Sequence, residues 1–139
     1  MVQLIVGKKG KGKTKHLLDK VNEQIKEVNG NIVYLDKSTK HMYELNNKVR
    51  LIDVSDFLVE DHAAFLGFVS GIISQDHDLQ QMYFDSFLKI AHLEGEDITP
   101  AVEKLEKISK KFSVDFILSV SEDEVDLPEV LRDKVIISL

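Results

Sequence analysis

The sequence predicts a three-layer α/β domain with a doubly wound, mostly parallel sheet of about five core strands. Short apolar runs of strand length alternate along the chain with segments whose apolar residues recur at helical spacing. Parallel strands need crossover connections, and the helical segments supply them. No repeat, low-complexity tract or linker interrupts the 139 residues, so one domain is expected over residues 1–139.

The first part of the chain predicts a strand, a loop, a helix and a second strand. Residues 2–6 form an apolar run that ends at Gly7, as in a buried strand. Gly30 stands where the C-cap of the following helix is expected. Residues 31–35 predict the second strand, which stops at Asp36. The helix itself is predicted from apolar residues at helical spacing: Leu17, Leu18, Val21, Ile25 and Val28.

Residues 37–60 have the weakest pattern in the chain. Asn46 and Asn47 predict a turn between two moderately extended pieces. The second of these pieces covers residues 49–54.

A second helix-forming segment follows this region. Asp61 suits the N-cap of a helix over residues 63–73, which is apolar nearly all round. Gly67 and Gly71 lie one turn apart on it, so a neighbouring element can approach closely. We therefore expect this helix to be central.

The last part of the chain predicts three strands and two helices. Residues 79–84 form a strand that ends in Asp85. Thr99 and Pro100 suit the N-cap and first turn of a helix with Lys110 and Lys111 in its last turn. The other expected elements are a strand over residues 114–120, a short helix over 127–132 and a last strand over 135–137.

Charge and composition narrow the classes of function. The chain carries 18 Lys and Arg against 24 Asp and Glu, a formal charge of −6, so it is not expected to coat nucleic acid or anionic membranes. It has no cysteine, which excludes disulfides, thiol catalysis and cysteine-based zinc sites. It shows neither an export leader nor an 18-residue apolar run, so a cytoplasmic location is expected.

Residues 7–14, with the sequence GKKGKGKT, match the pattern G-x-x-x-x-G-K-[ST] in full. They lie between a predicted strand and a predicted helix, which is the context that this phosphate-binding P-loop requires. Glycines let successive backbone N–H groups approach a phosphate, and the start of the helix adds its unpaired amides and its dipole. The loop therefore predicts binding of a nucleoside triphosphate, ATP or GTP.

Two side chains of this loop have specific expected roles. Lys13 would contact the β- and γ-phosphates as a point charge, and the hydroxyl group of Thr14 would ligate Mg²⁺. The other lysines raise the local positive potential of an acidic protein. The expected nucleotide-binding residues are Gly7, Lys8, Lys9, Gly10, Lys11, Gly12, Lys13, Thr14 and Lys15.

A magnesium site on a P-loop needs a second anchor, usually an aspartate at the end of a nearby strand. Asp85 follows the run LQQMYF, and Asp36 follows the run IVYL, so both are candidates. Either one also fits a helix cap or a surface turn. The order of the strands along the chain favours Asp85 as the metal ligand beside Thr14.

These features resemble the RecA-like branch of the P-loop NTPases, in which an additional strand lies between the P-loop strand and the Walker B strand. The resemblance rests on the P-loop, on Asp85 at its strand end, and on Ser119 and Ser121 at the end of the next strand. More narrowly, the chain resembles short bacterial P-loop proteins of unknown role, some of which carry the label of twitching-motility ATPases. The resemblance implies a P-loop NTPase-like fold and a site that binds Mg²⁺ with ATP or GTP.

The resemblance also implies catalytic roles. Ser86 follows Asp85, where that branch usually has the glutamate that polarises the attacking water. Asp36 is the expected substitute, because RecA-like proteins can place their catalytic acid at the end of the second strand. Lys13 is the other expected catalytic residue.

Other polar residues have two interpretations each. Ser119 and Ser121 could sense the γ-phosphate or simply form a turn. Arg50 and Arg132, the only arginines, could act as a finger on a neighbouring subunit or form surface salt bridges. The five histidines show no metal-ligand spacing along the chain.

Three functions remain, in order of preference. The first is a slow, Mg²⁺-dependent nucleoside triphosphatase. The second is a nucleotide-gated binding module that scarcely hydrolyses and signals by ordering residues 37–60. The third is a small-molecule kinase, for which 139 residues leave little room. The expected partner is the nucleoside triphosphate; a protein partner or self-association stays open, and neither membrane nor nucleic acid is expected.

Overall fold

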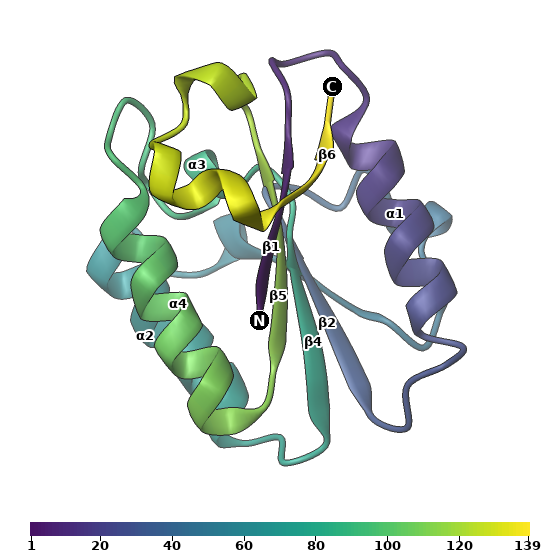
Figure 1. Ribbon diagram of the computed structural model, residues 1–139. Helices are drawn as coiled ribbons and strands as arrows, with labels where there is room; N and C mark the ends of the chain where they lie inside the picture. Colours follow the sequence, from purple (N-terminus) through teal and green to yellow (C-terminus); the bar gives the residue numbers. More distant parts are fainter.

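The computed structural model describes residues 1–139 and contains one six-stranded sheet whose strands all run parallel (Figure 1). The strands lie in the order β3-β2-β4-β5-β1-β6. Helices cover both faces, so the predicted three-layer α/β architecture is confirmed. The strands are β1 Val2–Val6, β2 Asn31–Asp36, β3 Arg50–Asp53, β4 Leu79–Phe84, β5 Asp115–Val120 and β6 Val135–Ser138.

The structure refines two details of the predicted sheet. It has six strands rather than about five, and it is parallel throughout rather than mostly parallel. The additional strand is β3, which lies within the extended piece predicted over residues 49–54 and pairs with β2 at the edge of the sheet from Arg50 opposite Val33. Because an edge strand is only partly covered, its side chains show little alternation of apolar and polar residues.

The helices divide between the two faces of the sheet. In Figure 1, α1 lies on one side, and α2 and α4 lie together on the other. The α-helices are α1 Lys13–Gln24, α2 His62–Ser74, α3 Phe87–Ile90 and α4 Thr99–Phe112. The 3₁₀ helices are η1 Met42–Glu44, η2 Val54–Asp56, η3 Glu124–Asp126 and η4 Glu129–Lys134.

Successive side chains of the central strands enter two different cores. Tyr34 of β2 and Tyr83 of β4 face α1, where their rings stack with centroids 6.2 Å apart. The next residues, Leu35 and Phe84, belong to the larger core under α2 and α4. Phe84 packs there against Phe65 of α2, with ring centroids 5.3 Å apart. Aromatic rings therefore hold both faces of β4.

The parallel arrangement brings the carboxyl ends of all strands to one edge of the sheet. Gly7 follows β1, Asp36 ends β2, Asp85 follows β4 and Ser121 follows β5. In open α/β sheets, ligands bind in the crevice outside this edge. The residues singled out by the sequence therefore meet at the position where such a fold places its site.

The expected role of Gly30 as a helix C-cap was wrong. Helix α1 ends at Gln24, and Ile25 is its C-cap. Gly30 instead precedes β2, where a Cβ atom would overlap the carbonyl oxygen of Asp78. The N–H group of Asn31 donates to that same carbonyl at 2.8 Å. The glycine is needed for a close approach of two chain segments.

The expectation that the helix over residues 63–73 is central was also wrong. Helix α2 lies on the sheet as an outer layer, and Gly67 and Gly71 are exposed with open space beside them. No neighbouring element approaches these glycines. One stripe of the helix faces the sheet and is buried: Phe65, Val69 and Ile73.

The predicted helix ends were partly right. Asp61 caps α2 as predicted, accepting a hydrogen bond from a backbone N–H at 2.7 Å. Thr99 is not an N-cap: it is the first residue of α4, and the carboxylate of Asp97 accepts its N–H at 2.9 Å. The short helix expected over residues 127–132 is the 3₁₀ helix η4, and α3 was not predicted.

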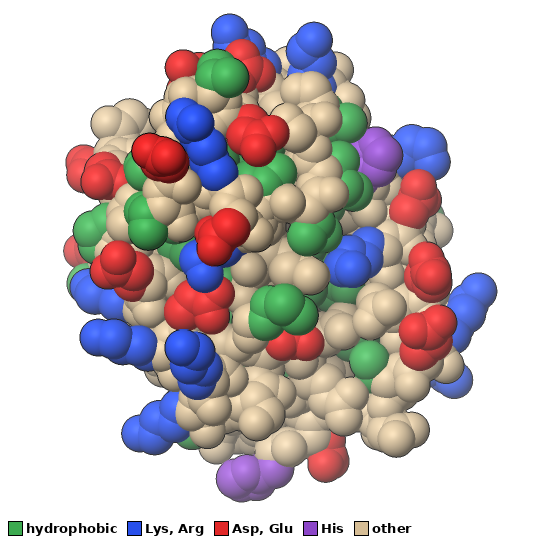
Figure 2. Space-filling model, viewed as in Figure 1, with side chains coloured by type: hydrophobic (Ala, Val, Ile, Leu, Met, Phe, Trp, Pro, Cys, Tyr) green, Lys and Arg blue, Asp and Glu red, His purple; other side chains and the backbone are tan.

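None of the helices has both the length and the apolar character needed to cross a lipid bilayer. On the face shown in Figure 2, acidic and basic side chains are interspersed and apolar side chains are scattered between them. That face therefore carries no extended patch of one charge.

Replacing Gly30 with alanine should lower the free energy of unfolding by about 1 to 3 kcal/mol, because the methyl group would overlap the backbone at Asp78. Gly67→Ala is the matched control. It adds a methyl group in open space and replaces glycine with a residue about 1 kcal/mol better in a helix, so it should stabilise the protein. Urea denaturation compares the two variants. A Gly30→Ala variant as stable as the wild type would contradict the close approach.

Candidate functional site

The loop between β1 and α1 exposes the amino end of the helix. Gly10 and Gly12 have φ angles of 87° and 93°, a left-handed conformation that glycine adopts without a steric penalty. Helix α1 begins directly after them, at Lys13. Gly7 anchors the start of the loop by donating its N–H to the carbonyl of Glu122 at 2.8 Å. The first N–H groups of a helix lack partners within it, so they are suited to bind an anion.

Lys13 is a nearly buried cation without an anionic partner. Its side chain is 8% exposed, and its ammonium group donates to the carbonyl of Lys8 at 3.1 Å. None of the five ion pairs in the structure includes it. Burial lowers the pKa of Lys13, and the charge of Asp85 opposes this effect. The arrangement favours an added anion beside Lys13.

Asp85 lies at the carboxyl end of β4 and receives hydrogen bonds from three hydroxyl groups. Thr14 and Ser119 donate to its Oδ1 atom at 3.2 and 3.1 Å, and Tyr34 donates to its Oδ2 atom at 2.8 Å. Burial and then the charge of Asp85 raise the pKa of Tyr34, so the phenol keeps its proton. The three donors come from α1, β5 and β2 and fix the position of the carboxylate.

Asp36 lies beside Asp85 at the end of β2 and is only partly satisfied. Its side chain is 2% exposed; Oδ1 accepts the backbone N–H of Lys37 at 2.7 Å, and Oδ2 is buried with no hydrogen-bond partner. Burial and then the negative charge of Asp85 raise the pKa of Asp36 to about 6. Asp36 can therefore exchange a proton near neutral pH, as a general base does.

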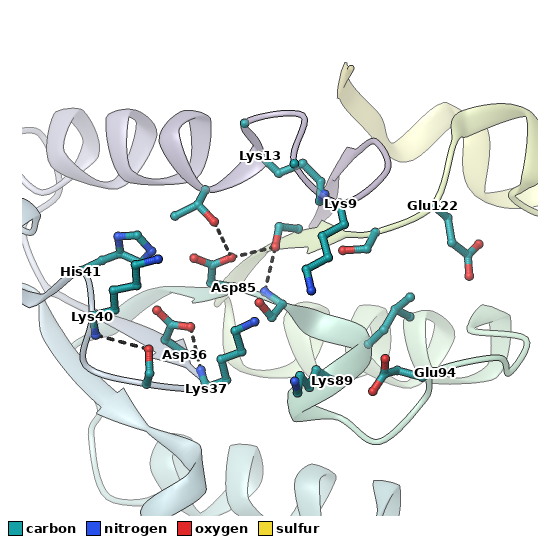
Figure 3. Close-up of a pocket in the computed structure, with 18 of the residues that line it drawn as sticks. Lys9, Lys13, Asp36, Lys37, Lys40, His41, Asp85, Lys89, Glu94 and Glu122 are labelled. Atoms are coloured by element: carbon teal, nitrogen blue, oxygen red, sulfur yellow. Dashed lines mark hydrogen bonds between the residues drawn. The ribbon is translucent and has the colours of Figure 1, made fainter.

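These groups line a pocket of about 760 Å³ at the carboxyl edge of the sheet, within the range of roughly 300 to 1,000 Å³ usual for ligand sites (Figure 3). Leu88 is its only apolar lining residue. Two acidic residues, Glu94 and Glu122, lie on its far side from Asp36. Lysines reach it from three segments: Lys9, Lys13, Lys37, Lys40 and Lys89. This lining suits a polar ligand with several negative charges.

The structure brings part of the expected loop residues into the pocket. Lys9, Gly10, Gly12, Lys13 and Thr14 line it, whereas Gly7, Lys8, Lys11 and Lys15 do not.

Two of the outlying lysines are engaged elsewhere. Lys8 forms an ion pair with Asp123 at 3.4 Å, and Lys15 forms one with Asp19 at 3.0 Å. Lys11 is exposed. These three lysines contribute charge near the site rather than pocket lining.

The serines at the end of β5 differ in their surroundings. Ser119 is 2% exposed; its hydroxyl group donates to Asp85 and accepts the N–H of Ser86 at 2.9 Å. Ser121 is exposed and lines the pocket. Ser86 has a φ of 54°, an uncommon left-handed conformation for a residue with a side chain, which turns the chain immediately after Asp85.

Neither arginine lines the pocket. Arg132 donates hydrogen bonds to the carbonyls of Val125 and Leu127, at 3.0 and 3.4 Å, and so braces the segment before β6. Arg50 is exposed on the edge strand β3. Neither forms a salt bridge.

Among the site residues that sequence reasoning missed, Tyr34 and His41 lie closest to the two carboxylates. Tyr34 stands two positions before Asp36 on β2, so the alternation of the strand could have placed both on the α1 face. His41 lies in the irregular segment after β2. One of its ring nitrogens and carboxylate oxygens of Asp36 and Asp85 lie within 4.8 Å of one another. Spacing along the chain hid this cluster because its members come from two separate strand ends and an irregular segment.

Comparison with models of known protein families and with curated proteins found no match to the chain. The ligand of the pocket is therefore inferred from the residues that line it. They combine free helix N–H groups, an unpaired lysine and two buried carboxylates.

Asp36→Asn should stabilise the metal-free protein at pH 8. The folded state holds the Asp36 proton with a pKa of about 6 against an ordinary value of 3.8, so stability falls as the pH rises through this interval. The penalty removed by asparagine at pH 8 is at most about 3 kcal/mol, and it should vanish below about pH 4. Urea denaturation at several pH values, with a chelator present, measures it. A pH-independent difference would contradict this account of Asp36.

Proposed function

We propose that this protein binds a nucleoside triphosphate, ATP or GTP, with Mg²⁺ and hydrolyses it slowly. The observation that carries the proposal is the position of the loop GKKGKGKT. It lies between β1 and α1, with Lys13 unpaired and with Asp36 and Asp85 across the same pocket. In this proposal the N–H groups at the start of α1 and the ammonium group of Lys13 bind the phosphates.

The order of the strands supports a RecA-like assignment. β5 lies between β1, which precedes the glycine-rich loop, and β4, which Asp85 follows. A strand in this position is the feature that the resemblance to the RecA-like branch of P-loop NTPases implies. The six-stranded parallel sheet is compatible with that branch, and we propose the assignment on the loop and the strand order together.

The residues across the pocket fit Mg²⁺. The ion prefers oxygen ligands, and the hydroxyl group of Thr14 already lies in a hydrogen bond with Asp85. The buried Oδ2 atom of Asp36 supplies another oxygen without a partner. Thr14 and Asp85 would hold the ion. When bound with the nucleotide, it neutralises charge on the phosphates.

In the proposed hydrolysis, Asp36 acts as the general base. A water molecule attacks the γ-phosphorus, the bond to the bridging oxygen breaks, and the products are the diphosphate and inorganic phosphate. Asp36 orients this water and accepts its proton, for which a pKa of about 6 is suitable. Lys13 stabilises the negative charge on the transferred phosphoryl group. Ser121 is the exposed serine available to contact the γ-phosphate.

The nucleotide-gated binding module remains the second candidate, because a specific observation favours it. Lys37, Lys40 and His41 line the pocket from the segment that follows β2. A phosphate bound there would change the contacts of this segment. Few groups of the pocket could accelerate hydrolysis. Ser86, rather than a glutamate, follows Asp85, and no arginine lines the pocket.

Lys13→Ala should weaken the binding of Mg²⁺–ATP by about 10- to 100-fold, because a lost charge-assisted contact is worth about 1.5 to 3 kcal/mol. Isothermal titration calorimetry with ATP and GTP measures this change. Lys11→Ala is the control, since Lys11 is exposed and does not line the pocket. Equal affinities of the wild type and a folded Lys13→Ala variant would refute triphosphate binding at this loop.

Turnover by the isolated protein should be far below the enzyme median of about 10 per second. Absence of an arginine finger alone costs about 10³- to 10⁵-fold in rate. Asp36→Asn should reduce the residual rate and leave ATP binding largely intact, whereas Asp56→Asn, at an exposed site away from the pocket, should change neither. Single-turnover hydrolysis decides the matter. Fast turnover that is insensitive to Asp36 would show that another group activates the water.

A further inference from the structure

We propose that Asp36, His41 and Asp85 form a site for a divalent transition-metal ion that binds without nucleotide and in preference to Mg²⁺. The three residues each offer one ligand atom, and these atoms lie within 4.8 Å of one another. Opposite ligands of a single ion lie roughly 4 Å apart, so small side-chain movements close the site. Figure 3 shows the three side chains together at one end of the pocket.

The charge of this cluster is not balanced by the protein. Asp36 and Asp85 are 2% and 3% exposed, and neither forms an ion pair. Lys37 and Lys40 line the same pocket but do not approach either carboxylate within salt-bridge distance. Two neighbouring buried carboxylates without a cation are costly to ionise. A divalent cation between them supplies the missing charge.

Both carboxylates retain capacity for a ligand bond. The Oδ2 atom of Asp36 is buried and has no hydrogen-bond partner. Asp85 accepts three hydrogen bonds, from Thr14, Ser119 and Tyr34. An ionised carboxylate has about four lone-pair sites, so one remains on Asp85.

A carboxylate contacts one ring nitrogen of His41, as is usual for histidines that bind a metal. Its Nδ1 atom lies 2.8 Å from the Oε2 atom of Glu44. A carboxylate on one ring nitrogen fixes the orientation and tautomer of the ring and leaves the other nitrogen free to bind a metal. With Glu44 on Nδ1, the available atom is Nε2.

The donor set determines which class of ion fits. Mg²⁺ favours oxygen ligands alone, whereas an imidazole nitrogen favours ions such as Co²⁺, Fe²⁺ and Zn²⁺. This metal site shares Asp36 and Asp85 with the nucleotide site of the proposed function, but it does not otherwise depend on that site. Binding of the ion alone requires neither the glycine-rich loop nor a nucleotide, so each proposal can fail separately.

Co²⁺ is the probe for the test. Calorimetric titration of the nucleotide-free protein should show one Co²⁺ per chain, bound at least about tenfold more tightly than Mg²⁺. His41→Ala should weaken Co²⁺ binding by about 10- to 100-fold. Asp36→Asn should weaken it as well. His77→Ala is the matched control, because His77 is exposed in the turn before β4 and has no hydrogen-bond partner.

A measurement on the wild type avoids any effect of substitution on folding. Paramagnetic Co²⁺ should shift the imidazole NMR signals of His41 and leave those of His77 unchanged. Unshifted His41 signals, equal effects of His41→Ala and His77→Ala, or Co²⁺ binding no tighter than Mg²⁺ would overturn the proposal.

The Lys13→Ala variant separates the two proposals. It should lose ATP affinity and keep the Co²⁺ site. Normal ATP binding by a protein without a Co²⁺ site would overturn this inference alone. A Co²⁺ site in a protein that binds no nucleotide would support it and refute the proposed function.

Discussion

The carboxylate of Asp85 is the point on which the geometry of the pocket depends. Hydroxyl groups of Thr14, Tyr34 and Ser119 donate to it from α1, β2 and β5. A hydrogen bond to a charged group contributes about 1.5 to 3 kcal/mol, so these three contacts hold the start of α1 and the strands β2 and β5 to the carboxylate that follows β4. The parallel strands make this possible, because all their carboxyl ends reach the same edge.

Around this point the folded chain leaves charges and polar atoms without partners. Lys13 has no anion, and Asp36 has a buried oxygen without a hydrogen bond. Such groups reduce stability in the free protein and become favourable when a ligand provides the missing partner. The packed aromatic side chains on both faces of β4 supply the rigid support that an unsatisfied site requires.

Several features could be predicted from the sequence because they depend on local patterns. The central strands and the N-cap at Asp61 follow from apolar periodicity and from side-chain chemistry. The extended piece predicted over residues 49–54 contains β3, but its pairing with β2 in the sheet could not be predicted, because this edge strand lacks alternation. The exposed position of Gly67 could not be predicted either, because an apolar helix sequence does not reveal which stripe faces the sheet. His41 joins the site through the path of an irregular segment, which no periodic signal describes.

The central claim is that the glycine-rich loop binds a triphosphate. The most direct measurement is a titration of ¹⁵N-labelled protein with Mg²⁺–ATP, followed by the backbone amide signals. The account predicts the largest shifts at Gly10, Gly12, Lys13 and Thr14, and none of comparable size with adenosine alone. Absence of shifts at these amides, or equal shifts with adenosine, would contradict it.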